Sequence, residues 1–402
     1  MKTLTPKQIA YSLAILASYS LMAFGRIISS YNKLASDPSY DFVEEINRLG
    51  IRSFISGTEG YIQIGPRIIA YIAHYFPLQN QAVVLSSVTT FLFIGLAILA
   101  NKAVHSQSGS FLLGYICGAI LLLVPAASES TVGNHGSVKW SVISVLCVVL
   151  TCPMFIKQFP KTTIAFVSFS VLCSPLAILS SVSIFLNIAR NRRSTPRIIL
   201  QVATVIIGLT GIQFVYWLNS GKGSRIYGGD IQYMPWSGMG QFWWSLLLTP
   251  PVFIIGSLMV LVIAKIIKRN LAITNQILLI TSTTLITCAS YVTTGIKDST
   301  AVAWQCLSWI VVVFTLHSIF QHLKYKTVGY LAILLCTAFF ARSIQKWYPA
   351  SWYLTDAKPW SNLVEDARDT CSTNEIEIAR IELLLSVVEI PCTQMLKGKD
   401  SQ

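Results

Sequence analysis

The sequence carries little charge and lacks the motifs that identify most soluble enzymes. Only 12% of its 402 residues are charged and 53% are hydrophobic, whereas a soluble domain usually carries about twice that share of charge. It contains no P-loop, no GxSxG elbow, no HExxH pair and no CxxC pair. Without these motifs, ATP-driven transport by this chain and the common hydrolase classes lack support.

Apolar runs fill most of the chain instead. Runs of about 20 residues can each cross a hydrocarbon core of about 30 Å as a helix. We therefore predict an all-α polytopic membrane protein with about nine full crossings. They lie at Ile9 to Ile28, Gln81 to Ala100, Phe111 to Val124, Val138 to Phe155, Ile198 to Leu218, Phe242 to Ala264, Ile273 to Val292, Ala301 to Phe320 and Val328 to Phe340.

Two apolar stretches do not fit a simple crossing. The stretch from Tyr61 to Phe76 contains a proline, an arginine and a histidine, so we expect a juxtamembrane helix, interfacial or re-entrant, on the outer face. Residues 162–188 are broken by Ser174-Pro175 and end beside a cluster of arginines, which a single crossing would place outside. We expect a broken helical hairpin that enters and leaves on the cytoplasmic side, with a single span as the alternative.

Charge sets the orientation of these helices. Basic residues gather in short hinges between apolar runs, and all 17 acidic residues fall in segments that this arrangement places outside. The positive-inside pattern puts the N-terminus in the cytoplasm and the C-terminus on the extracytoplasmic side. We therefore predict a multi-pass protein of the cell membrane. The net charge of +13 follows from this pattern, so we expect no nucleic-acid partner.

The predicted domains follow from the same topology. Residues 1–342 form a transmembrane domain that includes an extracytoplasmic loop one at 29–79, and residues 343–402 form a small acidic extracytoplasmic domain. Seven of the nine cysteines lie in apolar runs and are expected to be buried. Cys371 and Cys392 lie in the polar tail, on the side where a disulfide persists, and we predict that they are paired.

Loop one holds the first group of candidate catalytic residues. Its carboxylates include Asp41, Glu44 and Glu45, which could supply a general base or bind a divalent cation. The same residues lie at helical spacing with Arg48, so a solvated face of a short helix is the alternative. Which of the two holds depends on what lies near them.

The stretch from Gly57 to Phe76 is the most unusual part of the sequence. Its glycines permit tight turns, Pro66 suits the first turn of a helix, and Arg67 would lie at the headgroup boundary. Arg67 could pair with a substrate phosphate, with the carboxylate of Glu59, or with lipid headgroups.

Two further outer loops carry polar candidates. The loop from Pro125 to Trp140 contains Glu129, Asn134 and His135, which suit proton transfer, metal binding or merely fixing the loop. The loop from Gly221 to Trp244 contains Asp230 and several tryptophans, which suit a sugar-stacking surface or an interfacial aromatic belt.

The acids after span one, the stretch GYIQIGPRIIA and the acid-bearing second outer loop together resemble the GT-C superfamily of membrane glycosyltransferases. The pieces LLLVPAASESTVGNHGSVKW and WSNLVEDARDTC are also similar to a group of bacterial multispan membrane proteins of unassigned function. The GT-C resemblance implies transfer of a sugar from a polyprenyl-phosphate donor at the outer face. Loop one has no adjacent acid pair of the usual GT-C kind except Glu44-Glu45.

The resemblance also implies roles for individual residues. Asp41 would be the base or metal ligand and Arg67 would hold the donor phosphate, with a divalent cation as a possible cofactor. The remaining catalytic candidates are Glu44, Glu59, Glu129 and His135, and the substrate-binding candidates are Tyr61, Arg67, Asn134, Trp140 and Asp230. The expected partners are membrane lipid and a lipid-linked sugar. A lipid or lipid-linked-glycan translocase and a non-enzymatic envelope assembly protein are the alternatives.

Overall fold

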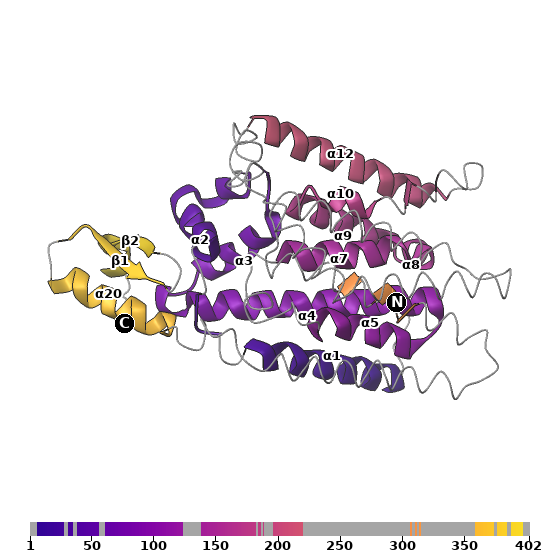
Figure 1. The fold of residues 1–402 in the computed structure, drawn as a ribbon, viewed down its shortest axis with the longest axis horizontal. Helices are drawn as coiled ribbons and strands as arrows, with labels where there is room; N and C mark the ends of the chain where they lie inside the picture. Colours follow the sequence, from indigo (N-terminus) through magenta and orange to yellow (C-terminus); the bar gives the residue numbers. More distant parts are fainter. Residues whose placement is uncertain are drawn as a thin grey trace, which may run out of the picture.

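The computed structural model describes a bundle of helices with a small domain at one end (Figure 1). The described residues are 6–27, 31–34, 38–55, 61–123, 138–181, 184–185, 188, 196–219, six positions between 306 and 314, 358–373, 376–383 and 387–396. The predicted helices at 242–264, 273–292 and 328–340 lie outside these ranges.

Three helices form one side of the bundle: α1 (Pro6–Ile27), α4 (Gln81–Ser108) and α5 (Phe111–Leu123). Their bounds lie close to those of three helices predicted from the apolar runs. Gly118 on α5 lets these helices approach, because a Cβ atom there would lie 2.6 Å from the carbonyl oxygen of Ala97 and would also strike the Tyr19 hydroxyl. Small residues at such crossings are typical of helices that pack in lipid. Tyr19 donates a hydrogen bond to the carbonyl of Tyr115 at 2.9 Å, joining α1 to α5.

The other side of the bundle contains α7 (Val138–Leu150), α8 (Pro153–Gln158), α9 (Pro160–Cys173), α10 (Ala177–Ser180) and α12 (Arg197–Asn219). The predicted crossing at 138–155 is interrupted after Leu150, since Pro153 cannot continue an α-helix begun before it. The predicted break at Ser174-Pro175 is present, with Ser174 extended at φ −160° and ψ 135°. Figure 1 shows the short α10 beside α9, and the choice between a hairpin and a single span at 162–188 stays a prediction.

Two described helices are long and apolar enough to cross a membrane, Leu78–Ser108 and Arg197–Tyr216. Large apolar side chains also lie exposed on the outside of the bundle, among them Leu21 on α1, Phe91 on α4 and Ile207 on α12. Exposed apolar surface of this kind is unfavourable in water and is typical of helices that contact lipid.

Loop one folds into short helices at one end of the bundle (Figure 1): α2 (Pro38–Leu49), the 3₁₀ helix η1 (Gly50–Ile55), α3 (Ile64–His74) and the 3₁₀ helix η2 (Leu78–Asn80). The predicted juxtamembrane helix corresponds to α3. The helical spacing of the loop-one acids is confirmed by α2, which buries Phe42, Val43 and Ile46.

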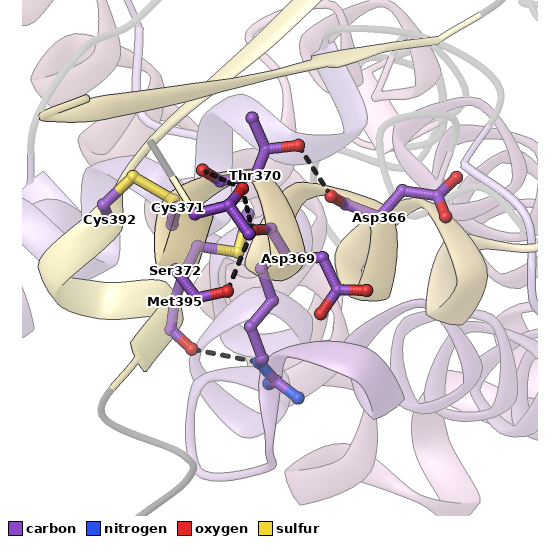
Figure 2. The surroundings of a disulfide bond; sticks show 9 residues. Asp366, Asp369, Thr370, Cys371, Ser372, Cys392 and Met395 are labelled. Atoms are coloured by element: carbon purple, nitrogen blue, oxygen red, sulfur yellow. Dashed lines mark hydrogen bonds between the residues drawn. A yellow bond between two sulfur atoms is a disulfide. The ribbon is translucent and has the colours of Figure 1, made fainter. Parts of the chain in front are cut away.

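The C-terminal domain corrects the all-α prediction. It contains α20 (Trp360–Thr373), α21 (Cys392–Leu396) and a two-stranded antiparallel sheet of β1 (Ile378–Glu382) and β2 (Val387–Pro391). Alternate residues of both strands are buried against the helices, which is the period-two pattern of a half-buried sheet. The predicted disulfide between Cys371 and Cys392 is confirmed and joins α20 to α21 (Figure 2).

Trp360 attaches this domain to loop one. Its side chain is fully buried, and its indole N–H donates to the carbonyl of Leu78 at 2.8 Å. Its backbone N–H donates to the carbonyl of Asn32 at 2.7 Å, while the Asn32 amide donates to the Ser361 hydroxyl at 3.0 Å. One residue at the start of α20 therefore holds both ends of loop one.

Candidate functional site

The segment Tyr61–Gln63, just before α3, is held in place by a buried amide on α12. The side chain of Gln213 accepts a hydrogen bond from the backbone N–H of Ile62 at 2.9 Å and donates to the Ile62 carbonyl at 3.0 Å. It also donates to the carbonyl of Val171 on α9 at 2.9 Å. Three bonds satisfy an amide whose burial in an apolar bundle would otherwise be costly. The segment is thus fixed against α9 and α12.

Tyr61 faces the first turn of α7. Lys139 donates a hydrogen bond from its ammonium to the Tyr61 hydroxyl at 3.0 Å. The same ammonium lies 5.7 Å from the centre of the Tyr61 ring and 5.8 Å from the centre of the Trp140 indole. Trp140 is buried, whereas Lys139 and Tyr61 are half-buried. We call these three residues the Lys139 site.

The Lys139 site combines a cation with aromatic rings at the surface of the bundle. An ammonium beside a tyrosine hydroxyl suits an anionic group such as a phosphate, and it also lies within reach of the Trp140 ring electrons. Tyr61 and Trp140 were predicted to bind substrate, and the structure brings them together around one cation. Lys139 was missed, although it is the sole lysine or arginine of the second outer loop and directly precedes Trp140.

Two predicted loops adjoin this site in the sequence. Residues 56–60, which include Glu59, end directly before Tyr61, and residues 124–137 end two positions before Lys139. Glu59, Glu129, Asn134, His135 and Asp230 themselves lie outside the described residues. Their predicted roles therefore stay predictions.

Arg67 lies in the first turn of α3, on its buried face. Its side chain is fully buried, and it forms an ion pair with Glu45 of α2 at 2.9 Å, whose side chain is 11% exposed. The guanidinium also donates to the backbone carbonyl of Ser53 and lies 5.6 Å from the centre of the Phe42 ring. Burial lowers the pKa of Arg67 from its ordinary value, and attraction to Glu45 opposes that shift.

These partners give Arg67 a structural role. It links α2, η1 and α3, and the headgroup-snorkelling alternative does not describe its buried side chain. Its expected role as the ligand of a donor phosphate stays a prediction. Glu44 is exposed on the outer side of α2, while Asp41 lies one turn before Glu45, on a helix that the Arg67 pair holds in place.

A concave surface lies on the C-terminal domain beside the disulfide, whose surroundings Figure 2 shows. It is an open groove of about 690 Å³, lined by Cys371, Ser372, Glu377, Ile378, Pro391 and Leu396 among others. Arg368 fixes one side of it by donating to the carbonyl of Met395 at 3.2 Å. None of the residues predicted for catalysis lines it.

Comparisons with known proteins do not identify a relative. No protein-family model matches the chain, and no curated protein matches it. Within the part of the chain that the structure describes, no group of three or more His, Cys, Asp or Glu side chains could hold a metal ion. The divalent cation suggested by the GT-C resemblance thus stays an expectation.

Proposed function

We propose that this chain is a polytopic membrane enzyme that transfers a sugar from a polyprenyl-phosphate donor at the outer face. In this proposal the chain crosses the membrane nine times, with residues 162–188 as a hairpin and the C-terminal domain outside. Loop one and the Lys139 site then lie together beside the outer headgroups. The resemblance of loop one to GT-C glycosyltransferases suggested this class.

The observation that carries the proposal is the contact between Lys139 and Tyr61. It joins the end of the GTEGY stretch to the end of the NHGSVKW stretch, 78 residues apart in the sequence. Glu59 lies two positions before Tyr61, and Glu129 lies in the same outer loop as Lys139, ten positions before it. A half-buried cation beside two acid-bearing loops suits a reaction in which an anionic phosphate leaves and a hydroxyl loses a proton.

Each group then has a chemical task. Lys139 offsets the charge that develops on the phosphate as the bond from the sugar carbon to the phosphate oxygen breaks. A loop carboxylate, for which Asp41 is the first candidate, accepts the proton of the attacking hydroxyl. Tyr61, which is half-buried, supplies aromatic surface for the sugar, while the buried Trp140 packs beside the Lys139 ammonium. Because the donor is already activated, no nucleotide-binding fold is required.

The proposal is tested by replacing Lys139 and Asp41 in the source organism. Lys139→Gln and Asp41→Asn should each reduce the transfer of the sugar to the envelope by at least tenfold, measured on isolated envelope glycans. The matched control is Lys102→Gln, because Lys102 is an exposed lysine near the C-terminal end of α4, whereas loop one adjoins the N-terminal end of that helix. Blotting of membranes must show equal amounts of each variant. If the glycans are unchanged in a Lys139 variant that is inserted and abundant, the proposed transferase activity is refuted.

The same strains separate the enzyme from the translocase alternative. Loss of a transferase leaves the lipid-linked sugar on the outer leaflet, where periodate added to sealed, outer-face-out vesicles oxidises it. Loss of a translocase leaves the sugar on the inner leaflet, protected from periodate. The third alternative, an envelope assembly protein, would use the groove on the C-terminal domain. It is supported only if removing this groove abolishes function while the Lys139 variants remain functional.

A further inference from the structure

One side of η1 is exposed although it is rich in apolar side chains. Ile51 is 73% exposed and Ile55 is 61% exposed, with exposed Arg52 between them in the sequence. The opposite side holds η1 in place, because Ser53 is buried and accepts a hydrogen bond from Arg67. The apolar side is therefore presented by an anchored element.

The exposed apolar surface continues onto α3. The ring of Phe54 in η1 lies 5.4 Å from the ring of Tyr71, which in turn lies 5.2 Å from Tyr75 and accepts a hydrogen bond from its hydroxyl at 2.6 Å. Ile68 and Ile72 are exposed one turn apart on α3, and Tyr75 and Phe76 are exposed in the turn that directly follows it. We call the exposed side chains of the two elements and of the turn after α3 the η1–α3 face: Ile51, Arg52, Ile55, Ile68, Ile72, Tyr75 and Phe76.

Two features of the η1–α3 face identify its occupant. First, α3 is followed after three residues by the helix Leu78–Ser108, which is long and apolar enough to cross a membrane. A face that adjoins the start of such a helix lies near the headgroups, where tyrosines are enriched. Second, Arg52 and the nearby Arg48 are exposed, and the described residues give neither an ion pair. Glu44 precedes Arg48 by one turn, so Arg52 is the less screened of the two.

We propose that the η1–α3 face lies in the outer headgroup layer and that Arg52, assisted by Arg48, binds the phosphate of anionic phospholipids. The isoleucines would enter the acyl boundary while the arginines remain at phosphate level, as in other interfacial amphipathic elements. The inference does not rest on the proposed transferase activity, so either can fail alone.

Depth in the bilayer is measured on full-length protein reconstituted into vesicles of phosphatidylglycerol and phosphatidylcholine. A nitroxide label at Ile51→Cys should be relaxed by oxygen and shielded from a water-soluble nickel complex. A label at Glu365→Cys, on the exposed side of α20, should show the reverse. Unsubstituted protein carried through the same labelling gives the background from native cysteines. Equal nickel accessibility at both labelled positions would overturn the placement.

The charge component is measured by the rise in thermal stability of the detergent-solubilised protein on adding phosphatidylglycerol, compared with phosphatidylcholine. Arg52→Gln should raise the phosphatidylglycerol concentration for half-maximal effect by roughly fivefold, and adding Arg48→Gln should raise it further. Arg380→Gln, an exposed arginine of the C-terminal domain, serves as the matched control and should leave it unchanged. If the double variant responds to phosphatidylglycerol like the parent, Arg48 and Arg52 do not bind lipid phosphate.

Discussion

The ion pair between Arg67 and Glu45 offers the sharpest test of how loop one is held. Arg67→Met removes a fully buried cation and, with it, the 2.9 Å ion pair to the 11%-exposed Glu45 carboxylate. Breaking a buried pair from one side costs about 3–5 kcal/mol, because the remaining charge is left uncompensated. The pair of Arg380 and Glu389 provides a control of nearly equal length, 3.0 Å, with side chains 75% and 53% exposed. Its loss through Arg380→Gln should cost at most about 1 kcal/mol.

The assay is unfolding by SDS titration in mixed micelles, followed by tryptophan fluorescence. The double variant Arg67→Met with Glu45→Gln should lose less free energy of unfolding than the two single variants lose together, because it removes both charges of the pair. The reasoning fails if Arg67→Met and Arg380→Gln lower the free energy of unfolding by the same small amount. It also fails if the two losses at Arg67 and Glu45 are additive.

Three other predictions concern packing and anchoring. Gly118→Ala should lower stability by about 1–3 kcal/mol through overpacking. Gly95→Ala is the control and should be neutral or stabilising, because an added Cβ atom there meets nothing within 4 Å. Equal thermal midpoints for the two variants would contradict this prediction. Replacing Cys371 and Cys392 by serine opens a cross-link between residues 21 apart in sequence and should cost the C-terminal domain about 3 kcal/mol, seen as faster proteolytic release; an unchanged release rate would argue against it. Gln213→Leu removes the hydrogen-bond partner of three buried backbone groups and should cost about 1–3 kcal/mol for each group left unsatisfied. Full stability in SDS titration would show that these Gln213 hydrogen bonds are dispensable.

The helices that could be predicted from the sequence are those whose formation depends on local pattern. The apolar run from Phe111 ends within one residue of α5, and the Ser174-Pro175 pair marks the end of α9, because run length and proline act locally. The strands β1 and β2 have the required alternation, but five residues in an acidic tail are too short to stand out against helices on either side.

Partners across the bundle could not be predicted in the same way. Lys139 has no sequence feature that points to Tyr61, and Gln213 lies 151 residues from the segment that it holds. Arg67 was expected to meet a phosphate, Glu59 or lipid headgroups, and its ion-pair partner proves to be Glu45, two short helices earlier. Such pairings depend on how separate elements pack, which a single sequence does not encode locally.

The hydrogen bonds of Trp360 to Leu78 and Asn32 also constrain how the chain threads a bilayer. Residues that touch must share a compartment, so the path between Leu78 and Trp360 must traverse the lipid an even number of times. Of the nine crossings predicted from the sequence, the first precedes Asn32, which leaves eight. Eight satisfies this parity rule if residues 162–188 return to the side they came from. A single traverse there would leave the last domain stranded opposite the loop that binds it.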